Sequence, residues 1–474
     1  MRKSFDVKFI SNGGADELKI NGSGNLIIYE DGIEITGTFS KRFTTPKEVK
    51  YLVNIEKIVN VIRTDETIFF QIYDEEHGTL NCSFNAGESS VSMQIESLLP
   101  TVITEEFKKQ VFEIHDFTEK LFKITPNAYI SNFLVKLIIG IFILMVINGV
   151  GFLNPSSEGL IKWGSNVSYL TSTGQWWRLF TCMFIHIGII HLMFNMWVLR
   201  AIGPLVERLF GNPAFLIIFL FSGVCGSLNS TYWHPNGISA GASAAIFGIA
   251  GALISYIIVY GKSIPMEIFK ELRSSFLSFI IINLIFGAAI TWVDNSAHIG
   301  GLIGGFVMGY ILAMPLDIDA RRKKFGMTIF KGIVVSFVIT SVLWSMIPKY
   351  TGEFQLTLKW FAEEERVANE QFKKHITALR DQPGKSIEVA GLIKKDCFLR
   401  WSEVVDRFSK LKIPVNNALY QRWELTLKFA QIQKDSMDNI IQGLEYNDPK
   451  KLNKFKDLQN QAKQIITEMK NIIK

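Results

Sequence analysis

The amino-acid sequence predicts an α-helical polytopic membrane protein, with a β-rich region before the membrane helices and an all-α region after them. Three observations lead to this fold class. First, 48% of the 474 residues are hydrophobic although 20% are charged, so the apolar residues must be concentrated in one part of the chain. Second, seven apolar segments between residues 131 and 347 approach or exceed the roughly 17 residues that can cross a bilayer. Third, the residues before them alternate in hydrophobicity as strands do, and those after them follow a helical period.

The loops between the apolar segments indicate how the membrane helices are oriented. The expected spans lie near residues 131–152, 179–200, 213–231, 240–260, 275–292, 297–314 and 328–347. Lysine and arginine gather in alternate loops, whereas the loops NSTYWHPNG and WVDNS contain neither. Because basic loops stay on the cytoplasmic side, the N-terminus is predicted to be cytoplasmic and the C-terminus extracytoplasmic. The start MRKSFDVKF lacks the apolar core of a signal peptide, so the first membrane segment is expected to be internal.

Residues 1–100 are expected to form a cytoplasmic β-rich domain. The stretch LIIYEDGIEITG predicts a hairpin with its turn at Asp31-Gly32. Four more strand-like runs follow, and the spacing of Val91 and Ile95 predicts a closing helix. A meander of about seven strands with one helix resembles the pleckstrin-homology (PH) or GRAM fold. Residues 101–128 are expected to form an amphipathic linker helix that leads into the membrane domain.

Residues 349–474 are expected to form an extracytoplasmic helical bundle or helical-repeat module after a seventh transmembrane helix at 326–348. Apolar residues at helical spacing define four faces, which contain Val367, Trp401, Trp423 and Phe455. Gln382-Pro383-Gly384, Pro414 and Asp448-Pro449 separate them. The partners of this region and of the N-terminal domain cannot be read from the sequence.

Composition also bears on several function classes. The net charge of +6 is small for the length, and no basic run is interleaved with aromatic residues, so nucleic acid is not an expected partner. The four cysteines, Cys82, Cys182, Cys225 and Cys397, lie far apart without CxxC spacing. They therefore predict neither a disulfide framework nor a zinc site, and no metal or cofactor is expected.

Polar side chains inside the apolar segments are the strongest functional signal, because such groups are costly in a bilayer. The second segment contains His186, His191 and Asn195, the fourth begins near Ser243, and the sixth begins near His298. With the predicted orientation, all three segments run inward from the outer face. At about 1.5 Å of rise per residue, these side chains are expected to share one shallow layer of the membrane.

Stripes of small residues predict that the fourth and sixth segments approach closely. The sixth has Ala297, Gly301, Gly305 and Gly309 at four-residue spacing, and the fourth has Ala244, Gly248 and Ala252. Such stripes let helix backbones come into contact in lipid. Ser243 and His298 could then reach hydrogen-bond distance, which is the minimal arrangement that activates a hydroxyl nucleophile.

These residue types also occur in other kinds of site. A serine among glycines and alanines is most often a packing residue, and histidines in a membrane span can form the proton or metal path of a transporter. However, no acidic residue lies in the middle of any span, although ion-coupled transport usually recruits Asp or Glu. No Cys, Asp or Glu completes a metal-ligand set at this depth either. Acyl-transfer chemistry is therefore favoured.

Three motifs resemble those of rhomboid intramembrane serine proteases. They are GASA at 241–244, AHIGGLIGG at 297–305 and HIGIIHLMFN at 186–195. Trp177-Arg178 and VDN at 293–295 are further matches, and the resemblance covers about residues 120–315. It implies a rhomboid-like six-helix bundle at 129–315 in a multi-pass protein of the cell membrane, and hydropathy adds the seventh helix after it. The frequent use of Lys, Ile and Asn suggests a bacterial plasma membrane.

The resemblance also implies roles for individual residues. Ser243 would be the nucleophile and His298 the general base, while His191 and Asn195 would stabilise the oxyanion together with the Ser243 N–H. The three supporting positions are His186, Gly241 (the glycine of the GxSx motif) and Phe247, which stands where several family members have tyrosine.

The implied substrates are single-span or polytopic membrane proteins within the lipid bilayer, cleaved near the outer face without a cofactor. The alternative is a catalytically silent rhomboid-like protein that binds membrane proteins or acts in their quality control.

Overall fold

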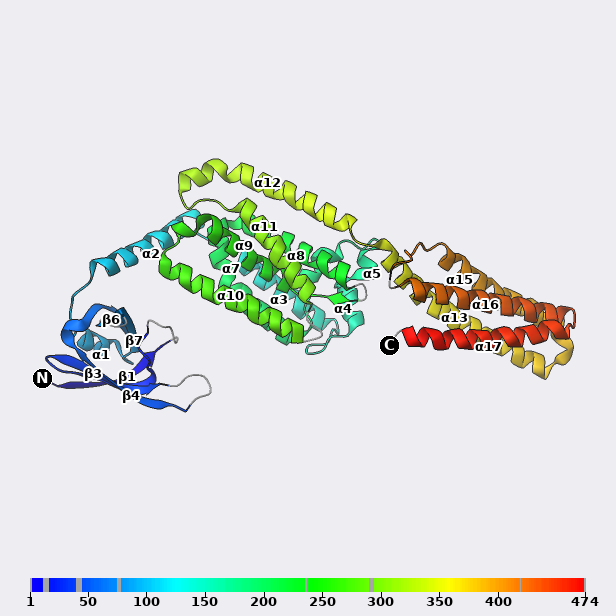
Figure 1. Cartoon of the computed structure of the whole chain (residues 1–474), viewed down its shortest axis with the longest axis horizontal. Helices are drawn as coiled ribbons and strands as arrows, with labels where there is room; N and C mark the ends of the chain where they lie inside the picture. Colours follow the sequence, from blue (N-terminus) through cyan, green and yellow to red (C-terminus); the bar gives the residue numbers. More distant parts are fainter. Residues whose placement is uncertain are drawn as a thin grey trace. The chain divides into compact units, whose positions relative to one another are not determined.

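The computed structural model describes residues 2–11, 17–39, 45–74, 78–234, 237–289, 294–417 and 419–472. The chain forms two compact units, Met1–Glu119 and Lys120–Lys474. Figure 1 traces the elements of both along the sequence.

The first unit is built on a seven-stranded antiparallel sheet with the strand order β4-β3-β2-β1-β7-β6-β5. The strands are β1 (Lys3–Ile10), β2 (Asn21–Ile28), β3 (Gly32–Phe39), β4 (Lys47–Asn54), β5 (Ile58–Thr64), β6 (Thr67–Asp74) and β7 (Gly78–Asn85). Ile28 pairs with Ile33 across the predicted turn, which confirms the hairpin. Helix α1 (Ser89–Glu96) places Ile95 in the core of the sheet. The β-rich N-terminal region is thus confirmed, and its PH/GRAM-like classification stays a prediction.

Helix α2 (Glu105–Ile124) follows the sheet, and membrane-type helices follow α2. Five of the described helical segments are long and apolar enough to cross a membrane. They are α3 (Ile130–Ile147), α7 (Gly188–Phe210), α8 (Asn212–Trp233), Ser243–Ser263, which includes α9 (Ser243–Tyr260), and α12 (Ile318–Ser345). Together they make the chain a multi-pass membrane protein. Helices α10 (Met266–Ala289) and α11 (Asn295–Leu312) occupy the other two expected spans, and the total of seven stays a prediction.

Helices α8, α9 and α11 lie against one another in the middle of the second unit (Figure 1). A Cβ atom added to Gly301 would lie 2.1 Å from the carbonyl oxygen of Ala244, and one added to Gly305 would lie 2.0 Å from that of Gly248. Backbone therefore meets backbone along the α9–α11 contact, which confirms that the small-residue stripes bring these two helices together.

Some helix ends differ from the expected spans. The segment expected to cross the membrane at 179–200 is interrupted: α6 (Arg178–Thr181) and a 3-10 turn (Cys182–Phe184) come first, and α7 begins only at Gly188. His186 therefore lies before the helix rather than in it. Helix α12 begins at Ile318, eight residues before the expected start at 326, because Asp317 caps its first turn by accepting a hydrogen bond from Ala320 N.

Short elements complete the loops between these helices. They are α4 (Ser157–Trp163), β8 (Asn166–Val167), α5 (Ser168–Thr171), β9 (Ile238–Ser239) and 3-10 turns at Ile55–Lys57, Gly261–Ser263 and Pro383–Lys385. Strands β8 and β9 pair with each other.

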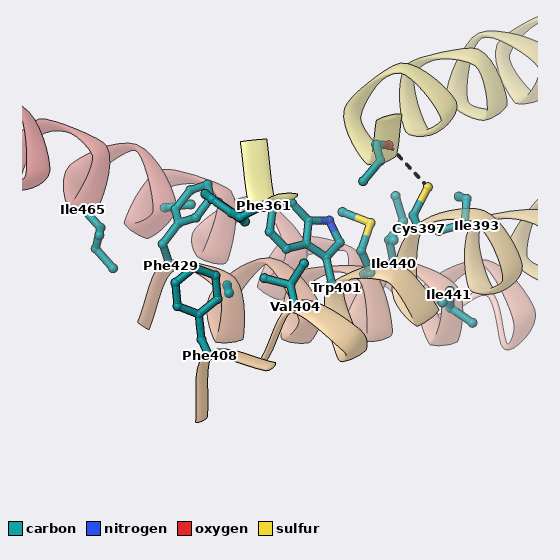
Figure 2. Packing of buried hydrophobic residues seen from close by; sticks show 14 of the residues in the cluster. Phe361, Ile393, Cys397, Trp401, Val404, Phe408, Phe429, Ile440, Ile441 and Ile465 are labelled. Carbon is teal, nitrogen blue, oxygen red and sulfur yellow. Dashed lines mark hydrogen bonds between the residues drawn. The ribbon is translucent and has the colours of Figure 1, made fainter. Parts of the chain in front are cut away.

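The C-terminal region is all-α, as its apolar periodicity predicts. It consists of α13 (Lys349–Asp381), α14 (Ser386–Ile393), a π-helical turn (Lys394–Phe398), α15 (Leu399–Ser409), α16 (Tyr420–Glu445) and α17 (Pro449–Ile472). Its core gathers aromatic rings from three of these helices, and Figure 2 shows Phe361, Trp401, Phe408 and Phe429 side by side. The helices end near Pro383, Pro414 and Pro449, where proline removes a backbone donor.

Candidate active site

The first residue of α9 and the first turn of α11 meet in the second unit. Nε2 of His298 lies 2.9 Å from Oγ of Ser243, within hydrogen-bond distance. Both side chains project from helices that the glycine stripes hold in backbone contact, so each is carried by a fixed element. The arrangement is that of a hydroxyl beside its base.

Stacking orients the His298 ring. Phe247, one helical turn after Ser243, lies parallel to that ring with 4.4 Å between centroids and 9° between planes. Nδ1 of His298 is buried and has no hydrogen-bond partner among the described residues. A ring contact, rather than a carboxylate acceptor on Nδ1, therefore holds the imidazole in place.

Asp294 fixes the start of the helix that carries His298. Its carboxylate accepts hydrogen bonds from the N–H of Ala297 at 3.1 Å and from the hydroxyl of Ser296, and another from the Ser230 hydroxyl on α8. This N-cap ties α11 to α8. The sequence included Asp294 only as part of the VDN match, and Val293 of that motif lies outside the described residues.

Gly241 lies where the chain approaches α7 most closely. Its φ of +125° is a conformation that side chains with a Cβ rarely adopt. A Cβ atom there would lie 2.5 Å from Cε1 of His191 and 3.5 Å from Nδ2 of Asn195. These two α7 side chains are therefore beside the turn that leads into Ser243.

The Asn195 amide is a hydrogen-bond donor without an acceptor. Nδ2 of Asn195 is buried and has no partner among the described residues. The N–H of Ser243 is in the first turn of α9, where backbone N–H groups point out of the helix. Both can donate to an oxygen atom that enters the site.

His186 supports the same turn from the segment before α7. It is completely buried, and its Nε2 accepts a hydrogen bond from the N–H of Ala242 at 3.3 Å. Its ring lies 5.2 Å from that of His191. The structure thus brings together all seven residues that the sequence singled out: Ser243, His298, His191, Asn195, His186, Gly241 and Phe247.

Five of them, Ser243, His298, His191, Asn195 and Phe247, border a cavity of about 540 Å³. Its polar lining includes Ser243, His298, His191 and Asn195, and its apolar lining comes mainly from α7, α9 and α10. The apolar residues include Ile190, Phe194, Trp197, Ile246, Phe279 and Ile282. The cavity can thus accept an apolar peptide segment next to the nucleophile.

Comparison with known proteins finds a family match over the region that contains this site. The family model of the rhomboid domain matches residues 173–315, which contain every one of these seven side chains. This part of the chain belongs to the rhomboid family.

Several rhomboid proteins are similar over the same region. Rhomboid protease GluP of Bacillus subtilis is 38% identical over 204 residues, which are 43% of this chain and 39% of GluP. RHOMBOID-like protein 6, mitochondrial, of Arabidopsis thaliana is 41% identical over 164 residues, 34% of this chain and 52% of that protein. Rhomboid protease AarA of Providencia stuartii is 35% identical over 183 residues, 34% of this chain and 65% of AarA.

The rhomboid match thus covers a part of each protein. The chain spans from about two fifths to two thirds of the length of these relatives. The N-terminal sheet and helices α13–α17 lie outside the residues matched by the family model.

Proposed function

We propose that the protein is an intramembrane serine endopeptidase that cleaves membrane proteins with a Ser243–His298 dyad. The observation that carries this proposal is the 2.9 Å separation of Ser243 Oγ and His298 Nε2 at the wall of an apolar cavity. The names of the relatives GluP and AarA, both rhomboid proteases, support it.

The reaction follows the sequence of acyl transfer. Nε2 of His298 accepts the hydroxyl proton as Ser243 Oγ attacks the scissile carbonyl carbon. The oxygen of the tetrahedral intermediate becomes negative and accepts hydrogen bonds from Asn195 Nδ2, the His191 ring and the Ser243 N–H. His298 then gives its proton to the leaving amine, and the acyl-enzyme is hydrolysed by water that His298 deprotonates in turn.

The substrates are transmembrane segments of single-span or polytopic proteins. The cavity wall is mainly apolar, so it suits side chains that arrive from lipid rather than from water. A helical segment must unwind locally, because its carbonyls are otherwise hydrogen-bonded and inaccessible to Ser243.

Substitution of the dyad tests the activity. Purified full-length protein in proteoliposomes would be incubated with a single-span substrate, and the cleavage products would be measured. Ser243→Ala and His298→Ala are each expected to lower kcat by about 10³-fold or more, and the double variant no further, because the two side chains act as one unit. Asn195→Ala is expected to cost less, about 10²-fold, since two other donors remain.

The same experiment separates the protease from a catalytically silent rhomboid-like protein. The silent alternative predicts that substrate is bound but never cleaved by the unchanged protein. Cleavage that persists in a folded Ser243→Ala variant would also contradict the dyad.

We further propose a cytoplasmic N-terminus and an extracytoplasmic C-terminus in a bacterial plasma membrane. The basic residues Arg208, Lys262, Arg321 and Arg322 lie at helix ends or turns away from the Ser243 end, and basic residues favour the cytoplasmic side. The dyad then faces the outer side.

A further inference from the structure

A second cavity lies at the end of the membrane helices that is far from the dyad. It measures about 600 Å³, and three chain segments line it: residues 123–129 from the end of α2 to the start of α3, 211–213 at the start of α8, and 318–325 at the start of α12. Helix α7 runs from the His191 end to this end, and α11 runs from His298 to the connection with α12. We call it the α8 cavity, because α8 begins at its wall.

A buried, incompletely satisfied guanidinium group lies at this cavity. Only 6% of Arg321 is exposed. Its Nη1 donates to the carbonyl oxygen of Leu209 at 2.9 Å, whereas its Nη2 has no hydrogen-bond partner among the described residues. No carboxylate of the described chain forms an ion pair with it. A buried cation without a counter-charge is unfavourable. Binding of an anion next to Arg321 would supply that counter-charge.

Nη2 of Arg321 points toward the beginning of α8. It lies 3.4 Å from the position that a Cβ atom on Gly211 would occupy, and Gly211 and Asn212 both line the cavity. Arg322, the next residue, is exposed and also lines the cavity. Two guanidinium groups therefore border one hollow.

The N-terminus of α8 adds to the positive potential. Gly211 supplies no side chain to cap this helix, and Pro213 follows at the first turn. The neighbouring helix α3 is different: the fully buried Glu207 carboxylate accepts hydrogen bonds from the N–H groups of Ile130 and Ser131 at 2.7 and 2.8 Å. Among the residues that the structure describes, no carboxylate accepts a hydrogen bond at the start of α8, and helix N-termini attract negative charge.

We propose that the α8 cavity binds a phosphate group, held by Arg321, Arg322 and the N-terminus of α8. Planar guanidinium groups match phosphate oxygens in charge and geometry. The group can belong to an anionic phospholipid headgroup or to a soluble phosphate compound. The rim favours the lipid, because the exposed ring of Tyr129 stands at the start of α3 and that of Phe325 in the first part of α12, and aromatic side chains are frequent at the level of the headgroups.

Binding of matched ligands to the detergent-solubilised full-length protein tests the proposal. Native mass spectrometry would measure binding, and thermal unfolding would measure Tm. Both would be carried out with short-chain phosphatidylglycerol, with the diacylglycerol of equal chain length, and with glycerol 3-phosphate. We expect saturable binding and a rise in Tm with phosphatidylglycerol and neither with diacylglycerol. Equal binding of the diacylglycerol would overturn the proposal. Equal binding of glycerol 3-phosphate would support the phosphate site and contradict a lipid as its source.

Variants then assign the site to these residues. Arg322→Gln is expected to raise the Kd for phosphatidylglycerol about tenfold or more, because a charge-assisted contact is lost. Lys323→Gln is the matched control, since Lys323 is an exposed neighbour that does not line the cavity. Equal affinities in these two variants would overturn the assignment. Arg321→Gln should weaken binding further, and if that variant does not fold, the Arg322 and Lys323 pair alone decides.

Discussion

The Phe247 ring is the residue that most directly sets the orientation of the base. It is 2% exposed and stacks on His298, and its ring also lies near the Phe279 ring of α10, with 5.4 Å between centroids. Because His298 Nδ1 lacks a partner among the described residues, removal of the ring leaves the imidazole free to rotate. The reaction rate falls steeply when a catalytic group is displaced from its productive position.

Phe247→Ala is therefore expected to lower kcat about tenfold or more while substrate KM changes little. Phe247→Tyr keeps the ring and should retain kcat within about threefold, because the stacking contact with His298 is preserved. Steady-state cleavage kinetics in proteoliposomes would measure both. Full kcat in a folded Phe247→Ala variant would show that the stacked ring does not position His298.

At the scale of the element, the contact between α9 and α11 decides whether the two reacting atoms meet. At Gly305 an added Cβ would approach Gly248 O, C and Cα to within 2.0–2.4 Å. These are main-chain atoms of a helix and cannot move aside as a flexible side chain can. A single methyl group must therefore push the helices apart.

Gly305→Ala is expected to destabilise the protein by about 1–3 kcal/mol, the usual range for overpacking, and to lower activity in parallel. Gly326→Ala is the control, because nothing lies within 4 Å of a Cβ at this α12 position, where alanine favours the helix. Thermal unfolding in detergent micelles would compare them. An unchanged Tm in Gly305→Ala would contradict the close contact.

Helix ends show where sequence reasoning succeeds and where it does not. Hydropathy indicated apolar segments that are largely helical in the structure, but it counts composition and cannot detect a break in a continuously apolar stretch. The interruption before α7 is such a break: Gly188 contacts the carbonyl of Leu153 so closely that a Cβ would lie 2.1 Å from that oxygen. That contact joins residues far apart in sequence, so no local pattern reveals it.

The site itself was largely accessible from the sequence. Polar side chains in apolar segments are rare, so Ser243 and His298 stood out, and small-residue spacing indicated which helices carry them together. The α8 cavity was not accessible, because Arg321 looked like one of four consecutive basic residues. Only the fold shows that its guanidinium is buried while Arg322, Lys323 and Lys324 are exposed.

At the scale of the whole molecule, the testable property is the side of the membrane on which each terminal region lies. The proposed orientation predicts that a membrane-impermeant thiol reagent labels Gly384→Cys in intact cells but labels Asp31→Cys only after permeabilisation. Both positions are exposed, and Gly384 has open space for a side chain. The reverse labelling pattern would overturn the orientation, and labelling of both positions on the same side would overturn the seventh span.

The native cysteines should give little background in that experiment. All four, Cys82, Cys182, Cys225 and Cys397, are buried. Burial also raises the pKa of the Cys397 thiol to about 12 and that of Cys82 above its usual range, so the reactive thiolate is scarce. The unchanged protein serves as the control and should remain unlabelled on both sides.

Main-chain contact between α9 and α11 has a consequence for the entropy of the reaction. Where side chains separate two helices, their rotamer changes let the helices shift by fractions of an ångström. Here no side chain intervenes at Gly301 or Gly305, so the two helices that carry Ser243 and His298 have almost no such freedom to lose when a peptide bond arrives. The relative placement of these helices is completed when the chain folds and is not left for the catalytic cycle to supply.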